Sequence, residues 1–192
     1  MAINLKESFQ VNAPIDAVWQ FLLDPHQVAP CMPGAELDEV VGDDTFLGNI
    51  KVKVGPIVAR YKGRVQFTRV EPSSHEIEMT ADGQEAGGGT ARGTISSRLQ
   101  ALDRNRTEVV AEATAEITGR VAQFGRGMIQ GISQQLFREF AASVTQRLES
   151  PELATSAAPK SKPIRIIPLV LGQIWSAVAG FFRRLFRRSG QA

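Results

Sequence analysis

The chain has 192 residues, of which 43% are hydrophobic and 22% charged, so its first 150 residues can bury the core of one domain. The formal net charge of +2 averages two unlike parts, because residues 151–192 carry seven Lys and Arg against one acid (+6) and residues 1–150 carry 15 against 19 (−4). The basic total is therefore no indication of nucleic-acid binding. The single cysteine, Cys31, excludes an internal disulfide, and the N-terminus shows no secretory signal, so we expect a cytoplasmic protein.

The first elements expected are a strand and a short helix. Apolar residues alternate with polar ones over residues 3–11, interrupted only by Glu7, which predicts a strand. Asn12 is a candidate cap for a helix over residues 14–23, because Pro14 suits a first turn and the apolar positions that follow share one helical face. A proline-rich bend is expected over residues 24–34.

A long β region and a final helix follow. Between residues 37 and 118 apolar positions recur with period two, which predicts about six consecutive antiparallel strands. Residues 121–148 contain no proline and carry apolar residues at helical intervals, which predicts one long amphipathic helix. The turns expected between the strands are Gly42–Asp44, Gly55–Pro56, Glu71–Ser74, Gly87–Gly89 and Asp103–Asn105. The order predicts an α+β fold, in which a curved antiparallel sheet of about seven strands wraps around the last helix.

Small residues on the inner face suggest an apolar cavity. The inward positions of the last two strands are mostly Ala, Gly and Ser, and protein interiors are close-packed, so either the helix packs closely on this floor or a space remains. The residues expected to line such a ligand site are Phe46, Ile50, Val52, Tyr61, Val65, Ile77, Met79, Gly93, Ile95, Ala113, Phe124, Met128 and Ile132. A large side chain introduced at Gly93 or Ala113 is expected to fill the cavity at little cost in stability.

The sequence offers little for catalysis. The two histidines, His26 and His75, lie far apart, and neither forms a metal-ligand spacing with Cys31. The glycine-rich segment that contains Gly127 and Gly131 lacks the spacing of a dinucleotide fingerprint, so we expect these two glycines to let the helix approach the sheet closely. No catalytic residue and no metal site is therefore predicted.

The end of the chain predicts a membrane anchor. Residues 150–163 are rich in Pro, Ser and Ala and are expected to link a domain of residues 1–149 to an anchoring segment of residues 164–192. At about 100° per residue, the apolar and basic side chains of that segment fall on different helix faces, which suits a helix lying among lipid headgroups. The membrane-binding residues expected are Leu171, Ile174, Trp175, Val178, Phe181, Phe182, Arg183, Arg184, Leu185, Phe186, Arg187 and Arg188. A last helix packed on the body, a partner-binding helix and a spanning helix remain alternatives, the last because residues 166–182 carry no charge.

Three segments resemble a known family, that of the carbon monoxide dehydrogenase G subunit, within the START-like, polyketide-cyclase-like (helix-grip) superfamily. They are residues 9–36, 46–65 and 111–129. The resemblance covers essentially residues 1–150, and its most specific parts are residues 51–57 and 122–127. It implies a helix-grip fold around an apolar cavity and a protein that is not itself an enzyme.

The resemblance also implies a partner and a ligand. The partner would be a molybdenum hydroxylase of the carbon monoxide dehydrogenase type. The ligand would be a hydrophobic molecule, with a respiratory quinone favoured, carried between lipid of the inner membrane and that enzyme for electron transfer. We therefore expect a peripheral protein on the cytoplasmic face of the cell membrane, with no resident cofactor besides a bound quinone or lipid-like ligand. The alternatives are a recruitment or maturation factor without ligand transport, and a cyclase or lyase of the same superfamily.

Overall fold

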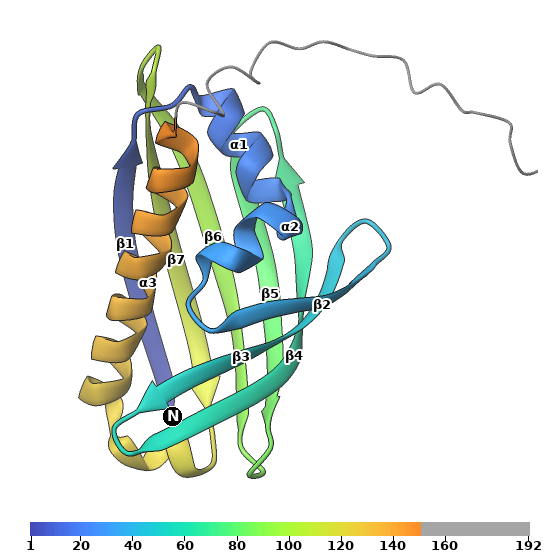
Figure 1. Cartoon of the computed structure of the whole chain (residues 1–192), viewed down its shortest axis with the longest axis vertical. Coiled ribbons are helices and arrows are strands. Elements are labelled where there is room, and N and C mark those ends of the chain that lie inside the picture. Colours follow the sequence, from blue (N-terminus) through green and yellow to red (C-terminus); the bar gives the residue numbers. More distant parts are fainter. Residues whose placement is uncertain (151–192) are drawn as a thin grey trace, which may run out of the picture. The chain divides into compact units, whose positions relative to one another are not determined.

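The structure, a computed structural model, describes residues 1–150 (Figure 1). Its elements, with η marking 3₁₀ helices, are β1 (Ala2–Val11), α1 (Ile15–Leu23), α2 (Pro25–Val28), η1 (Ala29–Cys31), β2 (Ala35–Val41), β3 (Thr45–Val54), β4 (Ile57–Glu71), β5 (Glu76–Glu85), β6 (Thr90–Asp103), β7 (Arg106–Ile117), η2 (Arg120–Phe124) and α3 (Arg126–Glu149). Apart from Ser150, the predicted linker lies outside the described residues, as does the whole of the predicted membrane anchor. Within the described part, no helix is both long and apolar enough to cross a membrane.

All strands form one antiparallel sheet of seven strands in the order β1-β7-β6-β5-β4-β3-β2. Strands β2 to β7 are consecutive hairpins, and the five predicted turns all fall between them, so the strand pattern is confirmed. Strand β1 pairs with β7, so the first strand lies beside the last one. In Figure 1, α3 runs along β1, while α1 lies over the upper part of the sheet and leads into α2 below it. The predicted helix-grip arrangement of sheet and C-terminal helix is thus confirmed.

Glycines let the sheet curve. A Cβ atom on Gly63 would lie 2.1 Å from the carbonyl oxygen of Asp82, and one on Gly93 would lie 2.3 Å from that of Thr114. Real side chains do not approach a neighbouring backbone so closely, so only glycine permits these strands to bend toward each other. The prediction that Gly93 accepts a large side chain at little cost is therefore wrong, because such a side chain would first meet the backbone of β7.

The start of α1 differs from the prediction. Asn12 is not its cap, because the residue before the helix is Pro14, whose carbonyl oxygen accepts hydrogen bonds from the amides of Ala17 and Val18 at 3.0 and 3.2 Å. The amide of Asn12 instead donates to Oε1 of Glu149 at 2.7 Å, which ties the end of β1 to the end of α3. The bend after α1 contains α2, capped by the carboxylate of Asp24, and η1.

The last helix is also interrupted. The sequence predicts one helix over residues 121–148, but the chain forms the short helix η2 and then α3, with Gly125 between them at φ 79° and ψ 159°. This backbone conformation is almost confined to glycine, so Gly125 is the residue that allows the break.

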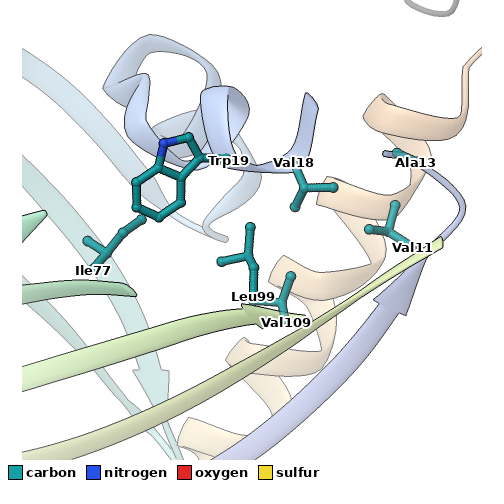
Figure 2. Close-up of a cluster of buried hydrophobic side chains, with 7 residues drawn as sticks. All are labelled: Val11, Ala13, Val18, Trp19, Ile77, Leu99 and Val109. Carbon is teal, nitrogen blue, oxygen red and sulfur yellow. The ribbon is translucent and has the colours of Figure 1, made fainter. Parts of the chain in front are cut away.

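Buried apolar side chains gather in three clusters. Figure 2 shows the first, the upper cluster, which docks α1 on the sheet and consists of Val11, Ala13, Val18, Trp19, Ile77, Leu99 and Val109. The lower cluster consists of Ile3, Val54, Ala59, Tyr61, Val121 and Ile129. A third, small cluster places Cys31 with Phe21 and Val144. Cys31 is 2% exposed, as expected of a buried small hydrophobe.

Candidate ligand-binding interior

The inner face of the sheet is incompletely covered between the upper and lower clusters. Leu5, Ala113 and Ile95 lie side by side on β1, β7 and β6, and all three point inward. Among the described residues these three contribute to none of the buried clusters, and each remains half-buried. An inward side chain that stays partly exposed borders space that solvent reaches on that face.

The predicted ligand-site residues are divided between the two ends of this region. Ile50, Val52, Tyr61, Phe124 and Ile132 meet in or against the lower cluster. Ile77 and Met79 belong to or pack against the upper one. Phe46 packs on Phe67 with ring centroids 5.0 Å apart, and Val65, Gly93, Ile95 and Ala113 are half-buried on the inner face. The residues therefore line one face without converging on a single point.

Met128 is placed differently from the other predicted residues. Its side chain is 46% exposed at the start of α3, whereas Ile129 is 4% exposed and enters the lower cluster. The expected close approach at Gly127 and Gly131 is wrong, because a Cβ atom at either position would meet nothing within 4 Å. This face of the first turns of α3 is turned to solvent.

An ion pair stands at the lower end of the interior. Glu85 is 4% exposed and follows Ile77 and the other inward residues of β5 at even spacing. Arg120 of η2 donates from Nη2 to Oε1 of Glu85 at 2.8 Å, while Oε2 of Glu85 is buried without a hydrogen-bond partner among residues 1–150. Sequence analysis missed this pair, although the period of β5 places Glu85 on the inner face.

Tyr61 lies beside this pair, because it is the cross-strand partner of Glu85. Burial, and to a lesser extent the charge of Glu85, raise the pKa of the Tyr61 phenol above its usual value of 10.0. At neutral pH the phenol is therefore a neutral hydrogen-bonding group at the edge of an apolar cluster.

The histidines do not converge with other metal ligands. His26 is exposed, and His75 stacks edge-on with Trp19 at 5.3 Å between ring centroids and lies 3.8 Å from Asp16. In the part of the chain that the structure describes, no three His, Cys, Asp or Glu side chains come together to hold a metal ion.

Two hollows, of about 650 and 390 Å³, lie on the opposite, outer face of the sheet. Several of their polar side chains are paired with one another. Lys6 contacts Glu112 at 2.7 Å, Arg92 contacts Asp82 at 3.1 Å, and the hydroxyls of Thr94 and Thr114 are 2.8 Å apart. This mutual pairing is typical of a solvated outer face and gives no separate site for a charged ligand.

Comparison with solved structures finds the same fold in several proteins. A conserved protein from Geobacillus kaustophilus superposes with a TM-score of 0.70 at 20% identity, over 76% of this chain and 95% of that one. The ZhuI aromatase/cyclase from Streptomyces sp. R1128 gives 0.58 at 19% identity, over 78% and 94%. A START superfamily protein from Mycobacterium smegmatis gives 0.53 at 13% identity, over 76% and 97%. At such identities the likeness shows the fold alone.

Among curated proteins the chain has no match. A protein family does match, over residues 8–149, from the second half of β1 to the last residue of α3. This span includes the inner face of strands β2 to β7, the ion pair of Glu85 with Arg120, and the whole of η2 and α3, but not the first half of β1 with Leu5. The chain belongs to the CoxG family, that of the carbon monoxide dehydrogenase G subunit.

Proposed function

We propose that this protein binds a hydrophobic molecule, a respiratory quinone above all, between the inner face of the sheet and α3, and carries it between the membrane and a molybdenum hydroxylase. The observation that supports this most is the half-buried apolar row of Leu5, Ala113 and Ile95 between two fully buried clusters. A long apolar chain that covers such a row gains about 25 cal/mol for each Å² removed from water.

The chemistry of the inner face favours carriage over catalysis. Its ionisable side chains among the described residues include Glu7, Tyr61 and Glu85, and the last is engaged by Arg120. A neutral phenol and a paired carboxylate can hold a polar headgroup by hydrogen bonds, but they do not form the nucleophile and base, or the acid and base, that a reaction requires.

The membrane and the hydroxylase enter the proposal from two other sources. Membership of the CoxG family supports an accessory role beside a carbon monoxide dehydrogenase-type hydroxylase. The sequence of residues 164–192, which combines apolar residues with paired arginines, supports a peripheral attachment to the cytoplasmic face of the membrane.

The ligand is tested by extracting lipid from the purified full-length protein and identifying it by mass spectrometry. We expect a quinone in the wild type and much less in Ala113→Phe, whose new ring would occupy the half-buried row. Ser96→Phe is the matched control, because Ser96 is an exposed neighbour of that row on the outer face of β6. Absence of any lipid would favour a recruitment or maturation factor, and conversion of an aromatic substrate by the protein alone would favour a cyclase.

Transfer itself is tested with the hydroxylase, its substrate and liposomes that contain quinone. Quinone reduction is expected to accelerate when the full-length protein is added, and to return to the basal rate with Ala113→Phe. An unchanged rate with the wild type contradicts the carrier function.

A further inference from the structure

The short helix η2 lies across the lower end of the interior. Val121, its second residue, is 5% exposed and belongs to the buried cluster that also contains Ile3 of β1 and Val54 of β3. Strands β7, β6, β5 and β4 separate β1 from β3 in the strand order, so these partners come from distant parts of the curved sheet. The cluster to which Val121 belongs therefore joins distant parts of the sheet, and η2 contributes one of its buried side chains.

Two further contacts hold η2 in this position. Arg120, at its start, donates to the buried carboxylate of Glu85 at the end of β5. Phe124, at its end, lies against the β3–β4 turn, where a Cβ atom on Gly55 would be 3.3 Å from its ring. The segment is thus fastened to two hairpin ends by one ion pair and one apolar contact.

Both ends of η2 are glycines in conformations that other residues rarely adopt. Gly119 has φ 79° and ψ −156°, and Gly125 has φ 79° and ψ 159°. Beyond Gly125, the exposed residues Gly127 and Gly131 leave the first turns of α3 without side-chain packing on that face. A segment of five residues between two such glycines can change its direction with few other rearrangements.

The ion pair is also incompletely satisfied. Within the part of the chain that the structure describes, Oε2 of Glu85 is buried without a hydrogen-bond partner, although a carboxylate normally accepts several hydrogen bonds. When η2 moves away, water reaches this oxygen and relieves its desolvation, which offsets part of the loss of the contact with Arg120. The ion pair between Arg120 and Glu85 therefore stabilises the closed position of η2 only modestly.

We propose that η2 is a gate over the lower end of the interior, hinged at Gly119 and Gly125, latched by Arg120 on Glu85, and opened to admit or release an apolar ligand. Only the identity of the ligand that passes the gate rests on the proposed carrier function. Its opening is a property of the protein alone and is measured without ligand.

Hydrogen exchange of the full-length protein tests the opening. The amides of Ala122 and Gly125 donate to Gly119 and Ala122 at 3.2 and 3.4 Å within η2, so they report on this segment. Val121→Ala truncates the buried side chain of η2 and is expected to accelerate their exchange roughly tenfold. Val109→Ala is the matched control, because Val109 is equally buried in the upper cluster, at 3% exposed. Equal acceleration by both variants would mean that η2 opens only with the whole domain and would overturn the gate.

A second pair of variants keeps the test decisive if Val121→Ala does not fold. Gly125→Ala disfavours the closed position through its positive φ alone, because its Cβ atom would meet nothing within 4 Å. Gly127→Ala, which also has open space around it, lies inside α3 and is the control. Exchange in η2 is expected to accelerate in the first variant and not in the second. The same rate in both contradicts the hinge.

Decylubiquinone binding, followed in stopped flow by quenching of tryptophan fluorescence, tests what the gate controls. A gate sets the rates of entry and exit alike, so Gly125→Ala is expected to raise the association and dissociation rate constants by the same factor, about fivefold to tenfold, with Kd unchanged. A weaker Kd with an unchanged association rate would make η2 part of the binding site and overturn the gate. If the wild type does not bind the probe, the quinone function fails, while the exchange experiment still decides the gate.

Discussion

Tyr61 is the residue through which the interior is most directly measured, because it is the only tyrosine of the chain. Burial, and then the Glu85 charge, raise the pKa of its phenol, so the ultraviolet absorbance of the folded protein is expected to titrate with a midpoint above 10.0. Glu85→Gln should lower the midpoint without returning it fully to 10.0, since burial is the larger cause. A wild-type midpoint at the usual value would show that the phenol is open to water.

The same shift has a consequence for stability. A pKa that is raised in the folded state gives a contribution that is complete below the unfolded value of 10.0 and is lost as pH rises from there toward the folded value. Above pH 10.0 the free energy of unfolding of Tyr61→Phe should therefore fall less steeply with pH than that of the wild type. Denaturant titrations on both sides of that pH provide the measurement.

Residue-level prediction from the sequence succeeded where a period was regular. Alternation along β4 and β5 correctly placed Tyr61 and Ile77 on the inner face. The same alternation carries Glu85 inward, but alternation alone does not predict a buried charge, since a carboxylate that loses its hydration is stable only when a cation meets it. That cation, Arg120, lies 35 residues away in sequence, and only the folded chain brings the two together.

Within the sheet, the inner rows differ in how completely they are packed. Leu99 is 4% exposed in the upper cluster, whereas Leu5 is half-buried in the row between the clusters. We expect Leu99→Ala to lower the free energy of unfolding by about 2–5 kcal/mol and Leu5→Ala by about 1 kcal/mol, because only the first leaves a closed cavity. Urea denaturation of both variants provides the measurement. Equal losses would mean that α3 packs solidly on the sheet and that no space remains for a ligand.

The helix α3 carries two glycines that its packing does not require. Gly127 and Gly131 are exposed, and a Cβ atom at either position would meet nothing within 4 Å. Replacement of each by Ala is expected to raise the free energy of unfolding by about 0.5–1 kcal/mol, since glycine loses more backbone entropy in a helix than alanine does. Gly93→Ala is the contrasting variant and should destabilise, because its Cβ atom would lie 2.3 Å from the Thr114 carbonyl oxygen. Loss of stability with Gly127→Ala would show a contact on this face.

Helices, strands and turns were predictable where the signal lies in neighbouring residues of the sequence. Every turn between β2 and β7 contains glycine, proline or a short polar residue, and each was placed correctly. The inward-facing positions of α3 were predicted less well. The prediction stepped back four residues from Ile132 to Met128, and at 3.6 residues per turn such a step rotates the position by about 40° away from the inner face. The inward residue at that end is Ile129. Val121 was missed as well, since it lies in η2, beyond the break at Gly125.

At the scale of the whole molecule, the uneven distribution of charge suggests that the two parts of the chain have different roles. Residues 1–150 carry a net charge of −4, whereas residues 151–192 carry +6. An anionic membrane repels the first part and attracts the second, so in the proposed attachment the basic segment, and not the body, would hold the protein on the lipid surface. The carrier function requires this attachment to be reversible or loosely tethered, which suits an amphipathic segment better than a spanning one.

The contribution of the arginines is separable from that of the apolar residues. We expect replacement of Arg183, Arg184, Arg187 and Arg188 by Gln to weaken binding of the full-length protein to vesicles of anionic lipid by about 1 kcal/mol per charge at low salt. At about 0.1 M salt and above the difference should shrink, because the screening length falls to about 10 Å. Co-sedimentation with anionic and with neutral vesicles is the measurement, and a chain ending at residue 163 is the control that should bind neither. An equal loss on neutral vesicles would exclude an electrostatic role for the arginines, and binding by the shortened chain would place the membrane affinity in the body.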